Sequence, residues 1–381
     1  MLDTLIGDER PLRWAVRFWP VFVAAFLSTL ATTALCKKIA LRFGIVDRPD
    51  HRVKTHAEPV AYLGGLGVLA GLVVGVFAGI YICRMDAAFR HTLPWFLGVL
   101  AGASIACLVG LADDLLDLRP RHKFLGQILA AALLLLVGID PNLQRAVEPF
   151  GWTLSTRLET ILDVLVVTFF VLGATNSLNL LDGLDGLCAG VTAIITGAML
   201  LLAVHLATWG FSDFGDPVRI VICLSLAGGL CGFLPFNRHP AKIFMGDAGS
   251  TLLGFVIAAL MIMFAEKVPR WWMASVVVFG LPILDTSVAV LRRALNRRPI
   301  LVSDRGHIYD QMIDRGLSLR KTVAICYGLA GIYALVGLLV SQIRTRYGAL
   351  VCLGTFVVSG VLVWRAGYLA MAGLRGAPRP R

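Results

Sequence analysis

The sequence predicts an all-α integral membrane protein with about eleven transmembrane helices. Its residues are 57% hydrophobic and only 15% charged, whereas soluble domains carry about 25% charged residues. The mean hydropathy is +0.79, and long apolar stretches recur from one end of the chain to the other. Strands of a membrane barrel would alternate apolar and polar residues, so these continuous stretches indicate helices.

Eleven apolar stretches are candidates for crossing a bilayer, which takes about 20 helical residues. Two of them, 124–139 and 250–265, are shorter than the others. We expect all eleven to form a single polytopic membrane domain over residues 1–381. They are residues 14–36, 60–82, 93–112, 124–139, 158–176, 186–205, 218–236, 250–265, 271–291, 322–341 and 348–370.

The distribution of basic residues predicts the orientation of these helices. If the N-terminus lies outside, the loops and tail on the inside hold 22 Lys and Arg residues, and the outside segments hold 10. Cytoplasmic loops of membrane proteins carry such an excess. We therefore expect the N-terminus outside and the C-terminus in the cytoplasm. The same rule accounts for the net charge of +11, so the charge does not indicate a nucleic-acid partner.

The polar residues that could perform chemistry gather in the loops predicted to be cytoplasmic. Functional sites are commonly built on loops that a rigid scaffold holds. We therefore predict one active site on the cytoplasmic face of the membrane. The contributing loops are residues 37–59, 113–123, 176–187, 237–249 and 292–321.

The stretch "LADDLLDLRPRHK" places three aspartates on one face of a predicted helix end. Asp117 follows Asp114 by three residues and Asp113 by four, and like charges at that spacing repel one another. A divalent cation bridged to phosphate would offset the repulsion. Arg121 and Lys123 follow immediately and could bind that phosphate. The alternative is an ordinary solvated helix end.

The stretch "NSLNLLDGLDGL", residues 176–187, carries an amide or carboxylate at every third position. Asn176, Asn179, Asp182 and Asp185 form this series, and two glycines within it permit tight turns. Such side chains could bind a base, a ribose or metal-bound water. The alternative is a polar helix cap, because the same residue types favour helix ends.

Three further loops each supply one or two candidate site residues. In "FNRHPAKIFMGDAGS", Asp247 lies in a glycine-flanked turn suited to a metal ligand, and Phe244 could stack on a planar base. Lys54 in the first loop could bind phosphate. Arg305 and His307 in the last loop could bind a diphosphate. The alternative for both basic loops is a role in topology alone.

The ninth predicted transmembrane helix contains an acidic residue. Asp285 lies in the stretch 271–291, and ionisable residues inside a membrane are usually functional. It could equally be paired with Arg292 or Arg293.

Four motifs in this order resemble the polyprenyl-phosphate N-acetylhexosamine-1-phosphate transferases, glycosyltransferase family 4. They are "DDLLD", "NSLNLLDGLDGL", "FMGDAGS" and "DRGHIYDQMIDRG". The resemblance covers about residues 37–320. It implies transfer of a sugar-1-phosphate from a UDP-N-acetylhexosamine to a membrane polyprenyl (undecaprenyl) phosphate, with release of UMP. It also implies dependence on Mg²⁺, with Mn²⁺ as the alternative, and a place in the bacterial inner membrane at the start of cell-wall or surface glycan synthesis.

The resemblance assigns roles to individual residues. Catalysis falls to Asp113 and Asp114, and metal binding falls to Asp247 with Asp114. Substrate binding is implied for Lys54, Arg121, Lys123, Asn179, Asp182, Asp185, Asn237, Phe244, Arg305 and His307.

The last loop departs from the family pattern. The family usually reads H-x-H-H there, whereas this chain reads His307-Ile308-Tyr309-Asp310. The diphosphate would then be left to Arg305 and His307. The chain also lacks the threonine-rich entry to the second transmembrane helix that the muramoyl-pentapeptide branch usually carries. The resemblance therefore favours the N-acetylglucosamine branch, with phospho-N-acetylmuramoyl-pentapeptide transferase as the alternative.

The sequence leaves two hypotheses from other functional classes open. An intramembrane prenyltransferase also uses aspartate-rich motifs, and an ion-coupled transporter also carries intramembrane acids. The acids here lie at one membrane face, which favours neither. The expected partners are the UDP-sugar, the polyprenyl phosphate and membrane lipid, without nucleic acid. A homodimer is an open alternative to a monomer.

Overall fold

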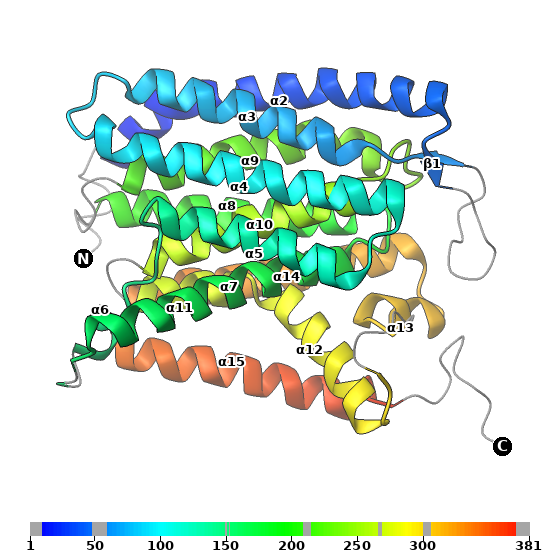
Figure 1. Ribbon diagram of the computed structural model, residues 1–381. Coiled ribbons are helices and arrows are strands. Elements are labelled where there is room, and N and C mark those ends of the chain that lie inside the picture. The colour runs from blue at the N-terminus through cyan, green and yellow to red at the C-terminus, as the bar shows by residue number, and fades with distance from the viewer. Residues whose placement is uncertain are drawn as a thin grey trace.

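The computed structural model describes residues 10–47, 59–148, 151, 153–208, 215–265, 269–299 and 306–370. It is a bundle of long helices with one two-stranded antiparallel hairpin, β1 (Val46–Asp47) with β2 (Val60–Ala61) (Figure 1). Among the described residues, nine helices are long and apolar enough to cross a membrane, or ten if one bent pair counts as a single crossing. The chain is therefore a multi-pass membrane protein, as the composition predicted.

The helices run the length of the bundle, apart from a few short ones at its two ends. In chain order they are α2 (Arg10–Phe43), α3 (Gly64–Cys83), α4 (Phe89–Leu116), α5 (Pro120–Leu136), α6 (Leu143–Val147), α7 (Thr156–Leu181), α8 (Leu187–Thr208), α9 (Gly215–Asn237), α10 (Gly246–Ala265), α11 (Pro269–Val278), α12 (Gly280–Leu295), α13 (Ile308–Asp314), α14 (Leu319–Gln342) and α15 (Thr345–Arg365).

Every predicted transmembrane stretch overlaps a helix, but the ninth one is not straight. Residues 271–291 divide into α11 and α12, which meet at an angle of 66°. The break falls at Phe279, just before Gly280 and Pro282. Proline lacks the N–H that would continue the hydrogen-bond ladder, and its ring clashes with the preceding turn. Beyond the break α12 leaves the bundle obliquely (Figure 1).

Several helices extend farther into the predicted loops than their apolar stretches indicated, and three of them carry candidate residues there. α4 ends only at Leu116, α7 continues to Leu181, and α10 begins at Gly246. Asp117 then ends α4 in the left-handed conformation, with φ of 49°. The candidate residues of these loops therefore lie mostly on helix ends, which hold them more rigidly than loops would.

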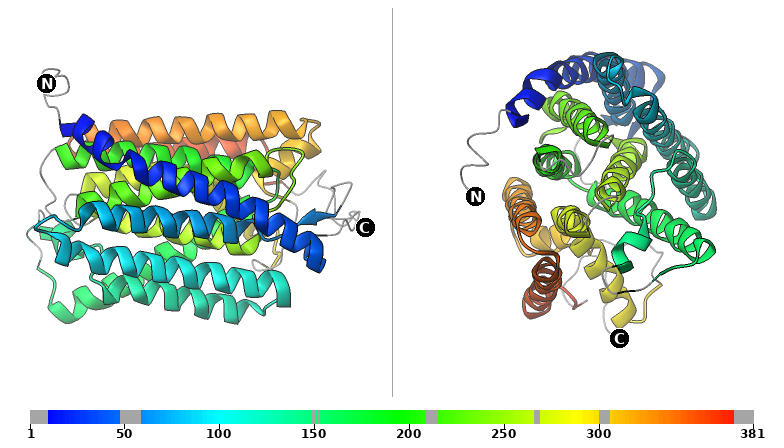
Figure 2. Two further views of the ribbon diagram at one scale, coloured as in Figure 1. Left: turned by 90° about the horizontal axis from the view of Figure 1, so that it is seen from above. Right: turned by 90° about the vertical axis from the view of Figure 1, so that its left-hand side faces the viewer.

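Helix α10 lies inside the bundle, and every residue of its apolar segment is buried (Figure 2). Glycines let its backbone approach its neighbours closely. A Cβ on Gly65 of α3 would lie 2.3 Å from the Gly249 nitrogen, and one on Gly254 would lie 2.4 Å from the Thr175 Cα of α7.

Both ends of α10 receive a charged side chain from another helix. Asp114 of α4 accepts hydrogen bonds from backbone N–H groups of its first turn. At the other end, Arg219 of α9 donates to the Met263 carbonyl at 2.7 Å and to Asp216 at 2.9 Å. Arg219 falls inside the predicted transmembrane stretch 218–236, and it satisfies a buried helix end there.

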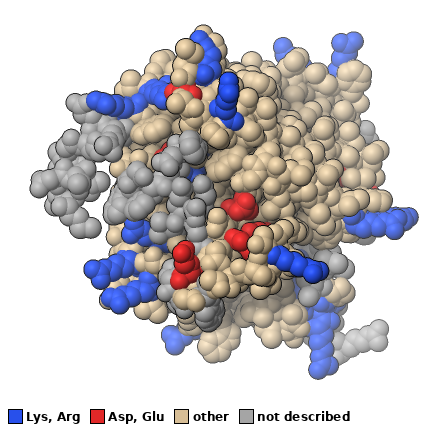
Figure 3. Space-filling model, turned by 60° about the vertical axis from the view of Figure 1, so that its left-hand side comes forward, with Lys and Arg blue, Asp and Glu red and all other residues tan. Residues whose placement is uncertain are grey.

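The outer surface suits a lipid environment. In the space-filling view most of the visible surface carries neither acidic nor basic side chains (Figure 3). Large apolar side chains on the outer helices are exposed, among them Leu165, Phe169, Leu335 and Leu350. They would contact lipid chains in a membrane.

The close packing of α10 against α7 predicts a specific sensitivity. Gly254→Ala should lower the free energy of unfolding by about 1–3 kcal/mol, because its Cβ would meet backbone atoms that cannot give way. Gly173→Ala in α7 is the matched control, since its Cβ would have nothing within 4 Å. Thermal unfolding of the detergent-solubilised protein measures both variants. Equal melting temperatures would contradict the packing argument.

Candidate functional site

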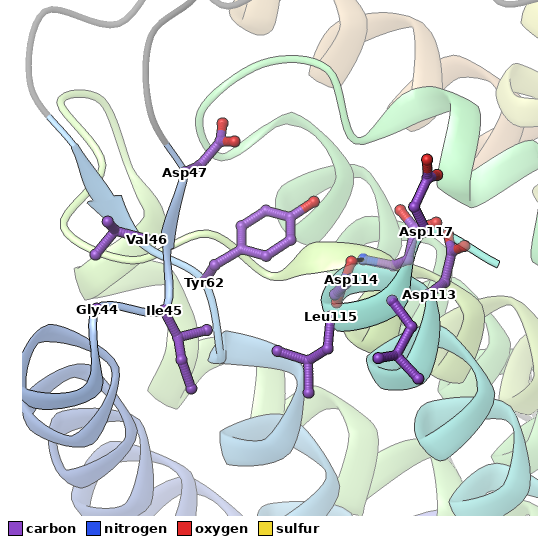
Figure 4. Close-up of a pocket in the computed structure, with 11 residues that line it drawn as sticks. Gly44, Ile45, Val46, Asp47, Tyr62, Asp113, Asp114, Leu115 and Asp117 are labelled. Atoms are coloured by element: carbon purple, nitrogen blue, oxygen red, sulfur yellow. Dashed lines mark hydrogen bonds between the residues drawn. The ribbon is translucent and has the colours of Figure 1, made fainter.

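A cleft of about 1010 Å³ lies at the end of the bundle where α4 ends and α10 begins. Aspartates of α4 stand on one side, and the segment around β1 stands on the other with the Tyr62 ring between them (Figure 4). The lining residues are Gly44, Ile45, Val46, Asp47, Tyr62, Asp113, Asp114, Leu115, Leu116, Asp117 and Asp247.

Asp114 joins α4 to the start of α10. Its Oδ1 accepts from the Asp247 N–H at 2.9 Å, and its Oδ2 accepts from the Ala248 N–H at 3.1 Å. Gly246 precedes them with φ of +73°, and a Cβ there would lie 2.5 Å from the Asp114 Oδ2. Only glycine fits this position without strain. The negative carboxylate also matches the positive end of the helix dipole.

Lys123, from the first turn of α5, bridges two of the aspartates. Its Nζ contacts the Asp113 carboxylate directly and lies 3.2 Å from the Asp247 Oδ2. Asp247 also accepts a hydrogen bond from the Asn179 amide of α7 at 2.7 Å. Four residues predicted from three separate stretches of sequence therefore meet at one point, each supplied by a different helix.

The site carries more negative than positive charge. Among the described residues, Asp113 and Asp247 contact the ammonium of Lys123, and Asp114 accepts from the Asp247 N–H. Burial and the carboxylates of Asp247 and Asp114 raise the pKa of Asp182, which ends α7, well above its usual range. Burial and then the same carboxylates raise the pKa of the Tyr62 phenol. An added cation would relieve the repulsion that these shifts reflect.

No group of three or more His, Cys, Asp or Glu side chains in the described part of the chain is arranged to surround a metal ion. The donor set nevertheless suits Mg²⁺, which usually binds one or two carboxylates and completes its shell with water and substrate phosphates. Asp113 and Asp247 already hold one cation, the Lys123 ammonium, between them. The residues present therefore fit a magnesium ion bound together with substrate.

Asn237 and Asp185 hold two loops together beside the cleft. The Asn237 Oδ1 accepts from the Gly186 N–H at 3.1 Å, and its Nδ2 donates to the Ile243 carbonyl at 3.1 Å. Asp185 accepts from the His239 Nδ1 at 2.7 Å and from the Ala241 N–H at 3.1 Å. Both were predicted to bind substrate. In the structure their polar atoms contact the protein and set the shape of the loops.

Phe244 meets Tyr62, a residue for which the sequence suggested no role. Their rings are 6.4 Å apart and nearly perpendicular, at 87°. The Phe244 N–H donates to the Ala61 carbonyl at 2.8 Å, and the Gly64 N–H donates to the Phe244 carbonyl at 2.9 Å. These bonds fix the predicted stacking residue next to the cleft. Its position two residues before the paired glycines Gly64 and Gly65 was the only signal for it.

His307 is buried and oriented by Asp285. Its Nδ1 lies 2.7 Å from the Asp285 Oδ2, and the Ile308 N–H donates to the Asp285 Oδ1 at 2.7 Å. This pairing identifies a partner for the acid of the ninth stretch that the sequence did not suggest. The His307 ring also stacks on Tyr309 with centroids 5.6 Å apart.

Arg121, a predicted phosphate-binding residue, is not brought into these contacts. Arg121 is exposed on the first turn of α5, two residues before Lys123. Lys54 and Arg305 lie outside the described residues.

Comparison with known proteins finds one family model and several similar bacterial transferases. The model of glycosyl transferase family 4 matches residues 96–265. A probable undecaprenyl-phosphate N-acetylglucosaminyl 1-phosphate transferase of Bacillus subtilis is 31% identical over 372 residues, which cover 96% of this chain and 94% of the relative. A decaprenyl-phosphate N-acetylglucosaminephosphotransferase of Mycobacterium tuberculosis is 32% identical, covering 90% and 87%. A phospho-N-acetylmuramoyl-pentapeptide-transferase of Desulforamulus reducens is 31% identical, covering 84% and 96%.

The double hydrogen bond to Asp114 predicts a loss of stability on a minimal change. Asp114→Asn retains the shape but has one accepting oxygen for two N–H donors, so we expect a loss of about 1–3 kcal/mol in unfolding free energy. Asp117→Asn is the control, because Asp117 is exposed and asparagine tolerates its left-handed backbone. Thermal unfolding without substrate measures both. An unchanged melting temperature for Asp114→Asn would refute the capping role.

Proposed function

Because the chain belongs to glycosyl transferase family 4, we propose that it transfers N-acetylglucosamine-1-phosphate to a membrane polyprenyl phosphate. Two of its relatives, similar over nearly the whole chain, are named for this activity. The observation in the structure that supports it most is the meeting of Asp113, Asp247, Asn179 and Lys123 at the cleft. An acidic site at the end of a membrane bundle suits a phosphate-bearing lipid and a soluble donor.

The proposed reaction is phosphoryl transfer from a UDP-sugar. An oxygen of the polyprenyl phosphate attacks the β-phosphorus of the donor, a new P–O bond forms, and the bond to the α-phosphate oxygen breaks. The products are polyprenyl diphosphate-N-acetylglucosamine and UMP. Little covalent chemistry falls to the protein in such a transfer, so catalysis is mainly positioning and neutralisation of charge.

The carboxylates of the cleft would hold the metal and the acceptor. Asp247 and Asp114 are the proposed Mg²⁺ residues, and Asp113 would orient the acceptor phosphate or accept its proton. Bound Mg²⁺ would neutralise charge on the transferring phosphate and polarise its oxygens. Lys123 would bind the acceptor phosphate, since its ammonium already lies among these carboxylates.

The donor would lie beside the end of α7. Phe244 is proposed to stack on the uracil, and Asn179 and Asp182 to contact the nucleotide. Asn237 and Asp185 would act through the loops that they hold together. The remaining proposed phosphate contacts are Lys54, Arg121, Arg305 and His307.

The muramoyl-pentapeptide activity is the second candidate, because a relative of that name is about as similar in identity. The last loop argues against it here. Tyr309 stands where the family pattern has its second histidine, and its hydroxyl donates a hydrogen bond to a backbone carbonyl. A prenyltransferase or an ion-coupled transporter is disfavoured because the acids lie at one end of the bundle and not near its middle.

A panel of UDP-sugars with polyprenyl phosphate tests the function. We expect UMP release with UDP-N-acetylglucosamine, loss of it with a chelator, and recovery with Mg²⁺. Asp247→Ala should reduce turnover more than about 100-fold with every donor, since a charged transition state loses its metal residue. No UMP from any donor would refute the proposed function.

A matched variant separates this effect from general damage. Asp86 lies in the connection between α3 and α4 and forms an ion pair at 2.7 Å with Arg17 of α2. It does not line the cleft. Asp86→Ala should keep near-normal turnover. Equal losses in Asp86→Ala and Asp247→Ala would remove the support for a metal role of Asp247.

The proposed topology has eleven crossings, with the N-terminus outside and the active site on the cytoplasmic face of a bacterial inner membrane. The count adds two elements to the nine straight helices, the bent pair α11–α12 and α5, which has 17 residues. At 1.5 Å per residue α5 is about 25 Å long, close to the hydrocarbon thickness.

Reporter fusions test this orientation. Alkaline phosphatase fused after residue 87 or 343, between crossings, should be active, because those sites would lie outside the cytoplasm. Fusions after residue 117 or at the C-terminus should be inactive with phosphatase and fluorescent with a cytoplasmic reporter. The reverse pattern would invert the topology and place the cleft outside.

A further inference from the structure

Tyr309 is buried against the end of α7, at the point where the chain turns toward α8. Its hydroxyl donates a hydrogen bond to the Leu180 carbonyl at 2.8 Å. The ring covers Gly183, where a Cβ would lie 2.2 Å from the Tyr309 hydroxyl oxygen. The side chain is 5% exposed. Tyr309 therefore fills the space beside the turn and satisfies one of the carbonyls that a helix end leaves without an internal partner.

The turn that follows α7, residues 182–186, is held from three directions. Tyr309 contacts it at its beginning, and Tyr327 of α14 donates to the Gly186 carbonyl at 2.6 Å. From the third side Asn237 accepts the Gly186 N–H. The backbone of this short segment thus has little freedom to move independently of α13, α14 and the loop after α9.

The same turn carries residues of the proposed donor site. Asp182 begins it, and Asn179, one helical turn earlier, donates to Asp247. A shift of the turn would move Asp182 and disturb the Asn179 contact at the cleft. The hydroxyl of Tyr309 is used on the backbone, so it is not free to contact the diphosphate.

We propose that Tyr309 is a positioning residue that fixes the turn at residues 182–186 for binding of the donor nucleotide. This inference rests on the proposed function for the identity of the donor. Tyr309 takes no part in the bond changes, and its effect is transmitted through the Leu180 carbonyl and the surface over Gly183. Its stacked neighbour His307 is held separately by Asp285.

Tyr309→Phe removes only the hydroxyl and tests this role. We expect the KM for UDP-N-acetylglucosamine to rise about fivefold, the effect of one lost hydrogen bond, with kcat within about twofold of the wild type. Tyr333→Phe is the matched control, because Tyr333 also donates a part-buried hydrogen bond, at 2.6 Å, but to Ser359 of α15 and not to the turn. It should leave both constants unchanged even if stability falls.

Two outcomes would overturn the proposal. One is an unchanged KM in Tyr309→Phe; the other is a fall in kcat at constant KM, which would place Tyr309 at the reacting phosphates. Tyr309→His gives a second test, since the imidazole is too short to reach the Leu180 carbonyl. A KM for this variant at or below that of the wild type would also refute positioning by the phenol.

A measurement without turnover separates this inference from the proposed function. Hydrogen exchange of the backbone amides in residues 176–187 should be faster in Tyr309→Phe than in the wild type or Tyr333→Phe. If the wild type released no UMP, the function would fail while the exchange still reported on the turn. Equal exchange in all three proteins would refute the structural role of Tyr309.

Discussion

The ends of α10 constrain the rest of the structure. This helix is buried along its apolar segment, so its terminal N–H and C=O groups cannot be satisfied by water. Asp114 supplies acceptors at the first turn, and Arg219 supplies a donor near the last one. Each charge also opposes the partial charge of the helix dipole at its own end. These two residues lie on α4 and α9. The position of each of these helices along the bundle axis is therefore fixed relative to α10.

The cleft is a consequence of this arrangement. Because Asp114 binds the Asp247 N–H, the two aspartates of different motifs are one hydrogen bond apart. The approach requires Gly110, where a Cβ would lie 2.3 Å from the Asp247 carbonyl oxygen. The same contact that stabilises the buried helix thus places a carboxylate cluster at the membrane face. A change to Asp114 would affect folding and chemistry together, so the two must be measured separately.

Much of this could be predicted from sequence, because the signals were local. Apolar length identified the long helices, and residue type with spacing singled out Asp113, Asn179 and Asp247 as candidate site residues, which the structure brings together. The bend between α11 and α12 was missed because the flanking hydropathy is continuous across Pro282. The contact of Asp285 with His307 joins residues 22 positions apart in sequence, and no periodicity reports such a pairing. Tyr62 and Tyr309 were missed as structural residues for the same reason.

The charges of the cleft differ in how firmly they are held. Asp114 and Asp247 are tied to backbone N–H groups or an amide, whereas Lys123 reaches its partners on a flexible four-carbon chain and is 34% exposed. A divalent cation that neutralised Asp247 would weaken the attraction holding the ammonium there. The ammonium could then turn to a phosphate without any movement of the carboxylates. A fixed negative cluster beside an adjustable positive group is thus suited to binding metal and phosphate together, and helix packing alone produces it.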